Sequence, residues 1–433
     1  MATVSPFTIG IRSSSRPFNR RAYGHRTLVT YSILSFLLLA SSSLLSPLPI
    51  PSTAMTSSPS LHLESRLRGA LWGLFSGDAL AAPTHWYYGG YRQVKADYGP
   101  SGITDYVKPA EFLAGSILNK SNVNGGGRGS FDRANGVSII GDVINHGKRG
   151  YWHPSKSYHY HATLQRGENT LEAQIARVLM RSVTSTGGTF DADHFRKAYV
   201  DFMTTPGSHN DTYASTCHRM FFANMIFKKL PPEKCPDNDR HNVDTIDGLV
   251  LPTVTILAMG GRIARGEDPV KVREEARVMA ERTAGVTRNS SALERASGTW
   301  SDLLLDILAA DEGADAQQSL NKAARSFGLR RMPVPNGRDE MSACYLDGSL
   351  PTLLDMISKY SRKGDAWTGL LANANVGGEN VHRGAVLGAA LGASVGEENL
   401  GPQEMLGGLY EREKLAEEID AFVRAVTRIE NDL

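Results

Sequence analysis

The sequence predicts an all-α domain, and three observations support this fold class. Apolar residues recur with helical spacing in the ranges 246–263, 269–283, 299–309, 316–327, 349–360 and 406–429. Few segments alternate polar and apolar residues as a half-buried strand does. The hydrophobic fraction of 41% is ample for a sizeable core. We therefore expect residues 61–433 to form one all-α domain with long loops.

The N-terminal residues 1–60 have the pattern of a targeting segment. All of the Lys and Arg before residue 64 are arginines between positions 12 and 26, and the first acidic residue is Glu64. An apolar run over residues 33–45 and a small-x-small pattern at Ser52-Thr53-Ala54 follow. A secretory signal, an organelle transit peptide, the two in series or an uncleaved signal anchor all fit this layout. We expect an organelle or the secretory pathway as the destination, with no stable membrane span in the mature domain.

Charge and cysteine content exclude two classes of function. With the N-terminal arginines set aside, the chain carries a small excess of acidic residues, which argues against nucleic-acid binding. Cys217, Cys235 and Cys344 are scattered and lack the spacing of metal ligands. This pattern argues against a disulfide framework and against a cysteine zinc site.

Two helices predicted far apart in the chain share a glycine pattern. Gly69, Gly73 and Gly77 follow one another at every fourth residue, as do Gly384, Gly388 and Gly392. Because glycine lowers helix stability, three in register indicate that another backbone comes close. We expect the two helices to pack against each other at the centre of the protein; two independent Ala/Gly-rich core helices are the alternative.

The segment between residues 81 and 161 loses the helical period and collects aromatic and histidine residues. Flat rings with a polar edge suit stacking on a base or packing under loops, and packing is the more ordinary outcome. His159 and His161 have a spacing that a metal pair can use. Hydrogen bonding explains such histidines as well, so we assign no metal to them.

The sequence Gly-Glu-Asn occurs at 167–169 and again at 378–380, each time just before a predicted helix. Asn169 and Glu172 have the spacing of a capping box, which explains the first occurrence alone. Two such segments at helix starts would bring two carboxylates and two amide oxygens to one place. Gly377-Gly378 also lets the backbone approach a ligand, and a helix N-terminus favours anions; a plain turn is the alternative.

A third polar cluster lies at His209-Asn210-Asp211, after a Pro-Gly turn. Its density of His, Asn and Asp fits a ligand-binding loop. A cap for the helix that carries Tyr213 and Cys217 fits equally well, with Asp211 as the capping residue.

The segment from Arg68 through Gly77-Asp78-Ala79-Leu80-Ala81-Ala82-Pro83 resembles the opening helix of the ADP-ribosylglycohydrolase family. Gly377-Gly378 with the glycine-striped helix after it is similar to that family's closing motif. The resemblance extends from about residue 61 to the C-terminus. It implies an all-α orthogonal bundle, a cleft for an ADP-ribosyl group and two magnesium ions, which the family holds on Thr-Asp-Asp and Asp-x-Asp-Thr.

This chain departs from both metal motifs. Glu168-Asn169 stands in place of Asp-Asp, and Glu379-Asn380-Val381-His382 stands in place of Asp-x-Asp-Thr. Two Glu and two Asn supply fewer negative charges than the family's motifs, so two dications would be poorly neutralised. We expect one magnesium ion at most, with Glu168, Asn169, Glu379 and Asn380 as its ligands.

The implied chemistry is hydrolysis at the ribose anomeric carbon of an ADP-ribosylated protein or a small nucleotide-sugar. Glu168 and Glu379 are the candidate catalytic residues, one to activate water and the other to stabilise charge or hold a cation. The candidate substrate-binding residues are Asp78, His85, Asn169, His209, Asn210, Asp211, Gly377, Gly378, Asn380 and His382. A non-catalytic protein that binds ADP-ribose or a nucleotide and has lost the two-metal site is the alternative function. Helix caps at Asp78, Asn169 and Asn380, with solvated glutamates, are the structural alternative.

Overall fold

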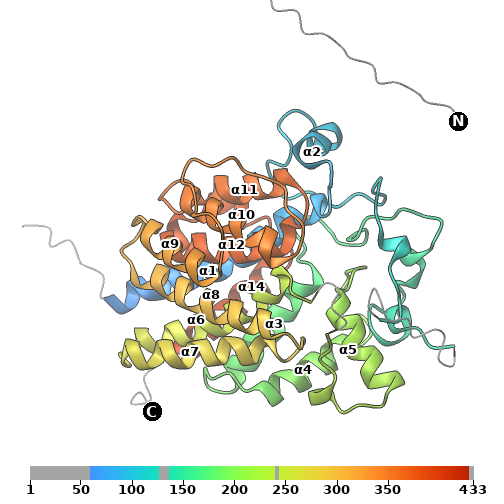
Figure 1. The fold of residues 1–433 in the computed structure, drawn as a ribbon, viewed down its shortest axis with the longest axis horizontal. Coiled ribbons are helices and arrows are strands. Elements are labelled where there is room, and N and C mark those ends of the chain that lie inside the picture. Colours follow the sequence, from blue (N-terminus) through green and yellow to red (C-terminus); the bar gives the residue numbers. More distant parts are fainter. Residues whose placement is uncertain (1–58, 126–135, 239–242, 429–433) are drawn as a thin grey trace, which may run out of the picture. The chain divides into compact units, whose positions relative to one another are not determined.

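A computed structural model describes residues 59–125, 136–238 and 243–428, and these residues contain fourteen α-helices and no β-strand (Figure 1). The all-α prediction is confirmed. Residues 1–58 of the predicted targeting segment lie outside the described residues. The described residues belong to one compact unit, Thr56–Leu433.

The helices follow one another along the chain, and the described residues between α2 and α3 are mostly irregular. They are α1 (Pro59–Ala81), α2 (Gly90–Tyr98), α3 (Leu171–Ser185), α4 (Ala192–Thr204), α5 (Thr216–Phe227), α6 (Val250–Ala264), α7 (Pro269–Ala284), α8 (Ser291–Ala309), α9 (Gln317–Ser326), α10 (Leu346–Tyr360), α11 (Ala366–Val376), α12 (Asn380–Val395), α13 (Gln403–Leu406) and α14 (Arg412–Thr427).

Two predicted helices, 299–309 and 406–429, differ most from the structure. Helix α8 begins at Ser291 because the Ser290 hydroxyl accepts a hydrogen bond from Leu293 N at 3.1 Å and caps the first turn. The predicted helix over 406–429 is divided between α13 and α14. Glu411, just before α14, has a left-handed backbone with φ of 52°, so the chain leaves the helical conformation between the two helices.

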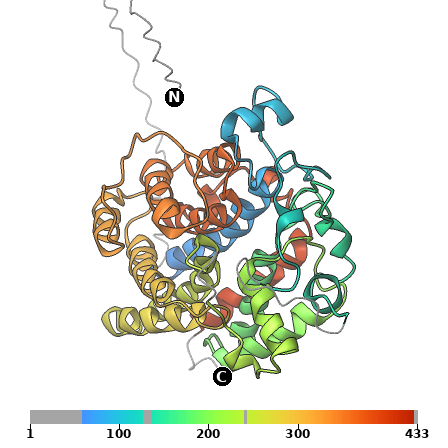
Figure 2. The same ribbon diagram turned by 45° about the vertical axis from the view of Figure 1, so that its right-hand side comes forward.

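Helices α1 and α12 form the centre of the bundle, and they lie side by side in both views (Figures 1 and 2). Their glycines face each other in antiparallel order: Gly69 meets Gly392, Gly73 meets Gly388 and Gly77 meets Gly384. A Cβ added at Gly69 would lie 2.6 Å from the Gly392 carbonyl oxygen. The predicted packing of the two glycine stripes is confirmed.

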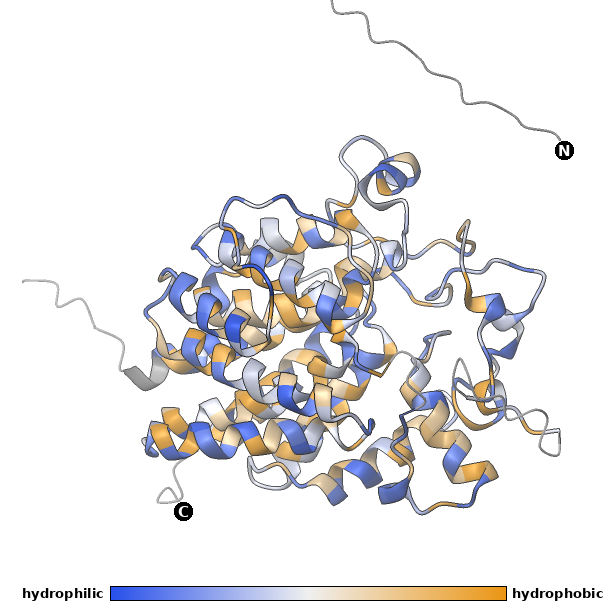
Figure 3. Cartoon of the chain, viewed as in Figure 1, coloured by the Kyte–Doolittle hydropathy of each residue, from blue (hydrophilic) through white to orange (hydrophobic). Residues whose placement is uncertain are grey.

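The surrounding helices bury one face and expose the other, so hydrophobic and hydrophilic residues share the same helices (Figure 3). Helix α6 is buried on all sides over most of its length, because its residues from Val250 to Gly261 are all buried. Among the described residues, Ile246–Ala264 is the one helical stretch with the length and hydropathy of a membrane span, and 89% of that window is buried inside the protein. A core helix of a folded domain gives the same pattern.

The N-terminus of α3 is held by carboxylates from other parts of the chain. Thr170 is the N-cap residue and makes no side-chain cap hydrogen bond, so the alternative of a capping box at Asn169 and Glu172 does not hold. Asp78 in α1 accepts a hydrogen bond from Thr170 N at 2.8 Å, and Asp211 accepts one from Leu171 N at 2.8 Å. The alternative in which Asp211 caps α5 does not hold either, because Ser215 occupies the N-cap position.

Candidate active site and metal centre

The Gly377-Gly378 turn delivers Glu379 to the start of α12. Both glycines have left-handed backbones, with φ of 66° and 68°, which favour glycine over residues with a side chain. Backbone hydrogen bonds attach the turn to the loop that follows α1. Trp86 N donates to Gly378 O at 2.8 Å, and Gly378 N donates to Tyr87 O at 3.2 Å. The Gly378 N–H therefore has a partner inside the protein.

A buried chain of hydrogen bonds joins five ionisable side chains in this region. His161 Nδ1 lies 2.8 Å from Asp211 Oδ1, and His161 Nε2 lies 2.7 Å from His85 Nδ1. His85 Nε2 is 3.2 Å from Glu379 Oε2, and Glu379 Oε1 is 2.6 Å from His382 Nδ1. The rings of His85 and His161 stack with centroids 4.9 Å apart. The chain links the loop after α4 to the N-terminus of α12.

Burial and pairing set the charges along this chain. Burial lowers the pKa of His85 to about 4, which keeps its imidazole neutral at physiological pH. Burial also opposes the charge of His382, but the Glu379 carboxylate outweighs it and raises the pKa of His382 to about 10. The pKa of Glu379 is correspondingly held well below its usual range by His382 and His85, against the effect of burial. Glu379 and His382 thus form a buried ion pair.

Among the described residues, His85, Glu379 and His382 are the one group of three or more His, Cys, Asp or Glu whose ligand atoms all lie within 4.8 Å of one another. The four residues expected to hold magnesium do not fit that ion. Two of the three side chains in this group offer imidazole nitrogen and only Glu379 offers oxygen, while Glu168 is not in the group. Magnesium requires nearly ideal octahedral oxygen coordination.

Glu168 lies on a different side of the site. It lines a cavity of about 600 Å³ together with Lys148, His209 and Asn210. Its Oε2 accepts hydrogen bonds from Gln165 N at 2.7 Å and from Asn210 Nδ2 at 3.2 Å. Burial raises the pKa of Glu168 above its usual value, although these hydrogen bonds oppose the shift. Glu168 is therefore a carboxylate of increased basicity that faces a space large enough for a ligand.

The two Gly-Glu-Asn segments converge on the same loop. Glu168 contacts Asn210, while Glu379 reaches the adjacent Asp211 through His85 and His161. The loop at His209-Asn210-Asp211 thus connects the two Gly-Glu-Asn segments. The structure places Glu168 and Glu379 in separate hydrogen-bonded groups that line different cavities.

The two asparagines of these segments make structural hydrogen bonds. Asn169 Nδ2 donates to Phe75 O at 2.8 Å and to Asp78 Oδ2 at 2.9 Å, which ties the start of α3 to α1. Asn380 Nδ2 donates to Thr84 Oγ1 at 2.8 Å, and its Oδ1 is buried without a hydrogen-bond partner among the described residues. Asp78 accepts hydrogen bonds from Asn169 Nδ2 and from Thr170 Oγ1, and it is fully buried.

Sequence reasoning missed a second buried cluster beside His382. Glu172 Oε2 lies 2.8 Å from His218 Nε2, and Arg288 donates to Asp247 Oδ2 at 2.8 Å. Two small cavities lie between the clusters: one of about 10 Å³ is lined by Glu172 and His382, and one of about 20 Å³ by Asp247, Glu379 and His382. Only the helical periodicity of α3, which turns Glu172 to its apolar face, could have signalled this cluster.

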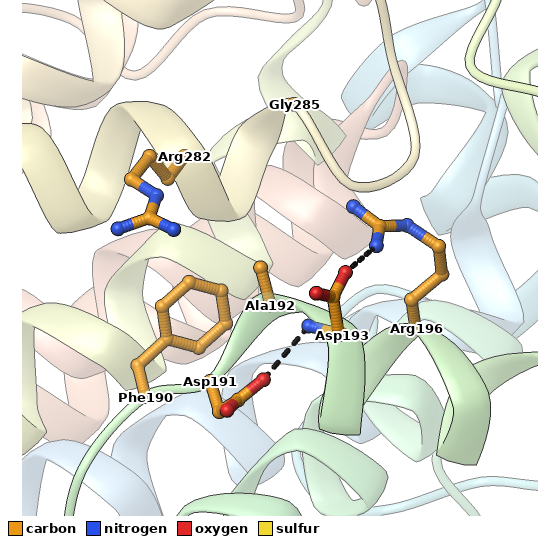
Figure 4. A pocket seen from close by; sticks show the side chains of 7 residues that line it. All are labelled: Phe190, Asp191, Ala192, Asp193, Arg196, Arg282 and Gly285. Carbon is orange, nitrogen blue, oxygen red and sulfur yellow. Dashed lines mark hydrogen bonds and ion pairs between the residues drawn. The ribbon is translucent and has the colours of Figure 1, made fainter. Parts of the chain in front are cut away.

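A cavity of about 530 Å³ between α4 and α7 contains none of the predicted site residues (Figure 4). Its acidic groups are engaged, because Asp191 caps α4 and Asp193 pairs with Arg196. We assign no role in the chemistry to it.

The model of the ADP-ribosylglycohydrolase family matches residues 59–431. The chain belongs to this family. The match covers the two Gly-Glu-Asn segments and the loop between them that joins their side chains. Membership of this family supports a glycohydrolase activity of the ADP-ribosyl type.

A solved structure entitled "ADP-ribosylglycohydrolase-related protein complex" is similar to this chain at 18% identity and a TM-score of 0.49, covering 84% of this chain and 99% of that one. No curated protein sequence matches the chain significantly.

Proposed function

We propose that this protein is a hydrolase that cleaves the glycosidic bond at the ribose anomeric carbon of an ADP-ribosylated protein or a small nucleotide-sugar, with Glu168 as the base that activates water. The observation that carries the proposal is the position of Glu168 in the wall of a cavity of about 600 Å³. Ligand pockets of this class hold about 300–1,000 Å³.

The lining of this cavity suits a substrate with a diphosphate and a sugar. Lys148 supplies a positive charge next to Glu168, and Asn210 bridges the two by accepting from Lys148 Nζ at 3.0 Å and donating to Glu168. The other Lys and Arg residues in the wall are paired with carboxylates, since Arg177 and Arg181 share Glu418 at 2.7 and 2.9 Å and Lys414 pairs with Glu411 at 3.6 Å. Lys148 is therefore the residue we assign to the phosphates.

The reaction follows from these positions. Glu168 takes a proton from water, the water oxygen bonds to the anomeric carbon, and the bond from that carbon to the leaving nitrogen or oxygen breaks. The leaving atom keeps the electron pair and takes up a proton from solvent. The transition state has oxocarbenium character, so the nearby carboxylate charge favours it as well. Raised basicity makes Glu168 a better proton acceptor than an ordinary surface carboxylate.

Glu379 has the second of the two roles expected for the glutamates, that of holding positive charge. Its side chain is only 2% exposed and does not line the Glu168 cavity. With both oxygens hydrogen-bonded to histidines, it is less suited than Glu168 to accept a proton from a substrate water. We propose that it fixes the loop at Asn210 and Asp211, which in turn orients Glu168.

Incubation of the protein with ADP-ribosylated arginine and serine peptides, with and without Mg²⁺, tests the proposal. Release of ADP-ribose from at least one substrate is the expected result. The rewritten metal motifs favour a second function, a non-catalytic ADP-ribose-binding protein. Binding of ADP-ribose without turnover under any metal condition would establish that function and overturn the first.

A further inference from the structure

His85, Glu379 and His382 have the composition of a transition-metal site. Their ligand atoms lie within 4.8 Å of one another, and all three side chains are buried. A tetrahedral ion with bonds of about 2.0–2.1 Å keeps its ligand atoms about 3.3 Å apart. The 3.2 Å between His85 Nε2 and Glu379 Oε2 fits that spacing. The 2.6 Å between Glu379 Oε1 and His382 Nδ1 is shorter and would widen when an ion entered.

The groups behind His85 have the arrangement found around metal-binding histidines. His85 Nδ1 contacts His161 Nε2 at 2.7 Å, and His161 Nδ1 contacts Asp211 at 2.8 Å. With an ion on His85 Nε2, one proton on each ring satisfies every remaining bond. His85 Nδ1–H donates to His161, whose Nδ1–H donates to Asp211. Such partners fix the tautomer and the direction of a ligating imidazole.

A place for a fourth ligand adjoins the group. The cavity of about 20 Å³ is lined by Glu379 and His382, and also by Thr245 and Asp247. A volume of this size holds about one water molecule. Glu172, in the neighbouring cavity with His382, has a buried Oε1 that makes no hydrogen bond among the described residues and lies 3.8 Å from Arg288 Nη2. The small cavities thus leave room for a water molecule beside the three side chains.

We propose that His85, Glu379 and His382 bind one divalent transition-metal ion of the Zn²⁺ class, with water as the fourth ligand. Imidazole nitrogens suit zinc, cobalt and iron, whereas magnesium takes oxygen ligands. With Glu379-Asn380-Val381-His382 in place of Asp-x-Asp-Thr, this position would bind a zinc-class ion instead of magnesium. The proposal does not depend on the hydrolase function, because metal binding is measured without a substrate.

Cobalt binding to the full chain tests the site directly. Co²⁺ should bind with one equivalent per chain and give the visible absorption of a four-coordinate ion, and Zn²⁺ should displace it while millimolar Mg²⁺ should not. His85→Gln and His382→Gln should each weaken Zn²⁺ binding at least tenfold in chelator competition. Asp211→Asn, a change to a positioning residue, should weaken it by about 10–100-fold.

The matched control is His153→Ala, which removes an exposed histidine outside the group and should leave the affinity unchanged. Absence of stoichiometric Co²⁺ and Zn²⁺ binding by the wild type, or equal affinity in the His85 and His382 variants, overturns the proposal. If the variants fail to fold, X-ray absorption of the zinc-loaded wild type decides instead. Two imidazoles in the first coordination shell support the site, and a shell without imidazole refutes it.

Discussion

Gly73 of α1 and Gly388 of α12 bring two helix backbones into direct contact. A Cβ added at Gly73 would overlap the Gly388 carbonyl group, which is backbone and cannot rotate away. We expect Gly73→Ala to lower the free energy of unfolding by about 3 kcal/mol, because overpacking a rigid contact forces the helices apart.

Gly348→Ala in α10 is the matched control, since a Cβ there meets nothing within 4 Å. It should be neutral or stabilise the protein by about 0.5–1 kcal/mol. Urea unfolding of both variants measures the difference. Equal stability of the two variants would contradict the packing described for α1 and α12.

The buried pair of Asp247 and Arg288 predicts a pH dependence of stability. Burial opposes ionisation of Asp247, but Arg288 outweighs it and lowers the pKa from 3.8 to about 2. A depressed carboxylate pKa adds stability above the unfolded-state value and loses it as pH falls toward the folded-state value. We therefore expect this residue to contribute a loss of about 2 kcal/mol between pH 4 and pH 2.

Asp247→Asn should be less stable than the wild type at pH 5, because it leaves Arg288 buried without its charge partner. It should also lose less stability on acidification. Urea unfolding at successive pH values compares the two slopes, and parallel slopes would show that Asp247 does not carry this charge effect.

The central helices could be predicted from the sequence because glycine spacing reports backbone contact directly. The two Gly-Glu-Asn segments and the His209-Asn210-Asp211 cluster could also be recognised from the sequence as polar groups. The hydrogen bonds that connect them could not be predicted, because His85, His161 and Asp211 come from three loops whose paths depend on tertiary packing. The spacing of Glu172 from Asn169 also fits a capping box, but Thr170 is the N-cap residue and Glu172 pairs with His218. Local patterns located the residues but could not determine their partners.

Lys148 should govern the affinity for the diphosphate part of the substrate. Lys148→Met should raise the Kd for ADP-ribose about tenfold, since a hydrogen bond to a charged group contributes about 1.5–3 kcal/mol. The control is Lys414→Met in the same cavity, because Lys414 already pairs with Glu411. Calorimetric titration at two salt concentrations measures both. Wild-type affinity of the Lys148 variant for ADP-ribose would show that another part of the protein binds the phosphates.

The dependence of kcat/KM on pH should report the ionisation of the Glu168 carboxyl group. A base must be ionised, so kcat/KM should rise with pH through the pKa of Glu168, which burial raises above 4.5. The rise should be missing from the residual activity of Glu168→Gln. An acidic limb centred at or below pH 4.5 in the wild type would show that a different group acts as the base.

Turnover by Glu168→Gln is the most direct measurement of the proposed function. The amide preserves the shape of the side chain but cannot accept a proton from water, so kcat should fall about 10²–10⁴-fold while the Kd for ADP-ribose changes little. Glu411→Gln, in the wall of the same cavity, should keep wild-type kcat. A Glu168→Gln variant that releases ADP-ribose at the wild-type rate would contradict the assignment of Glu168 as the catalytic base.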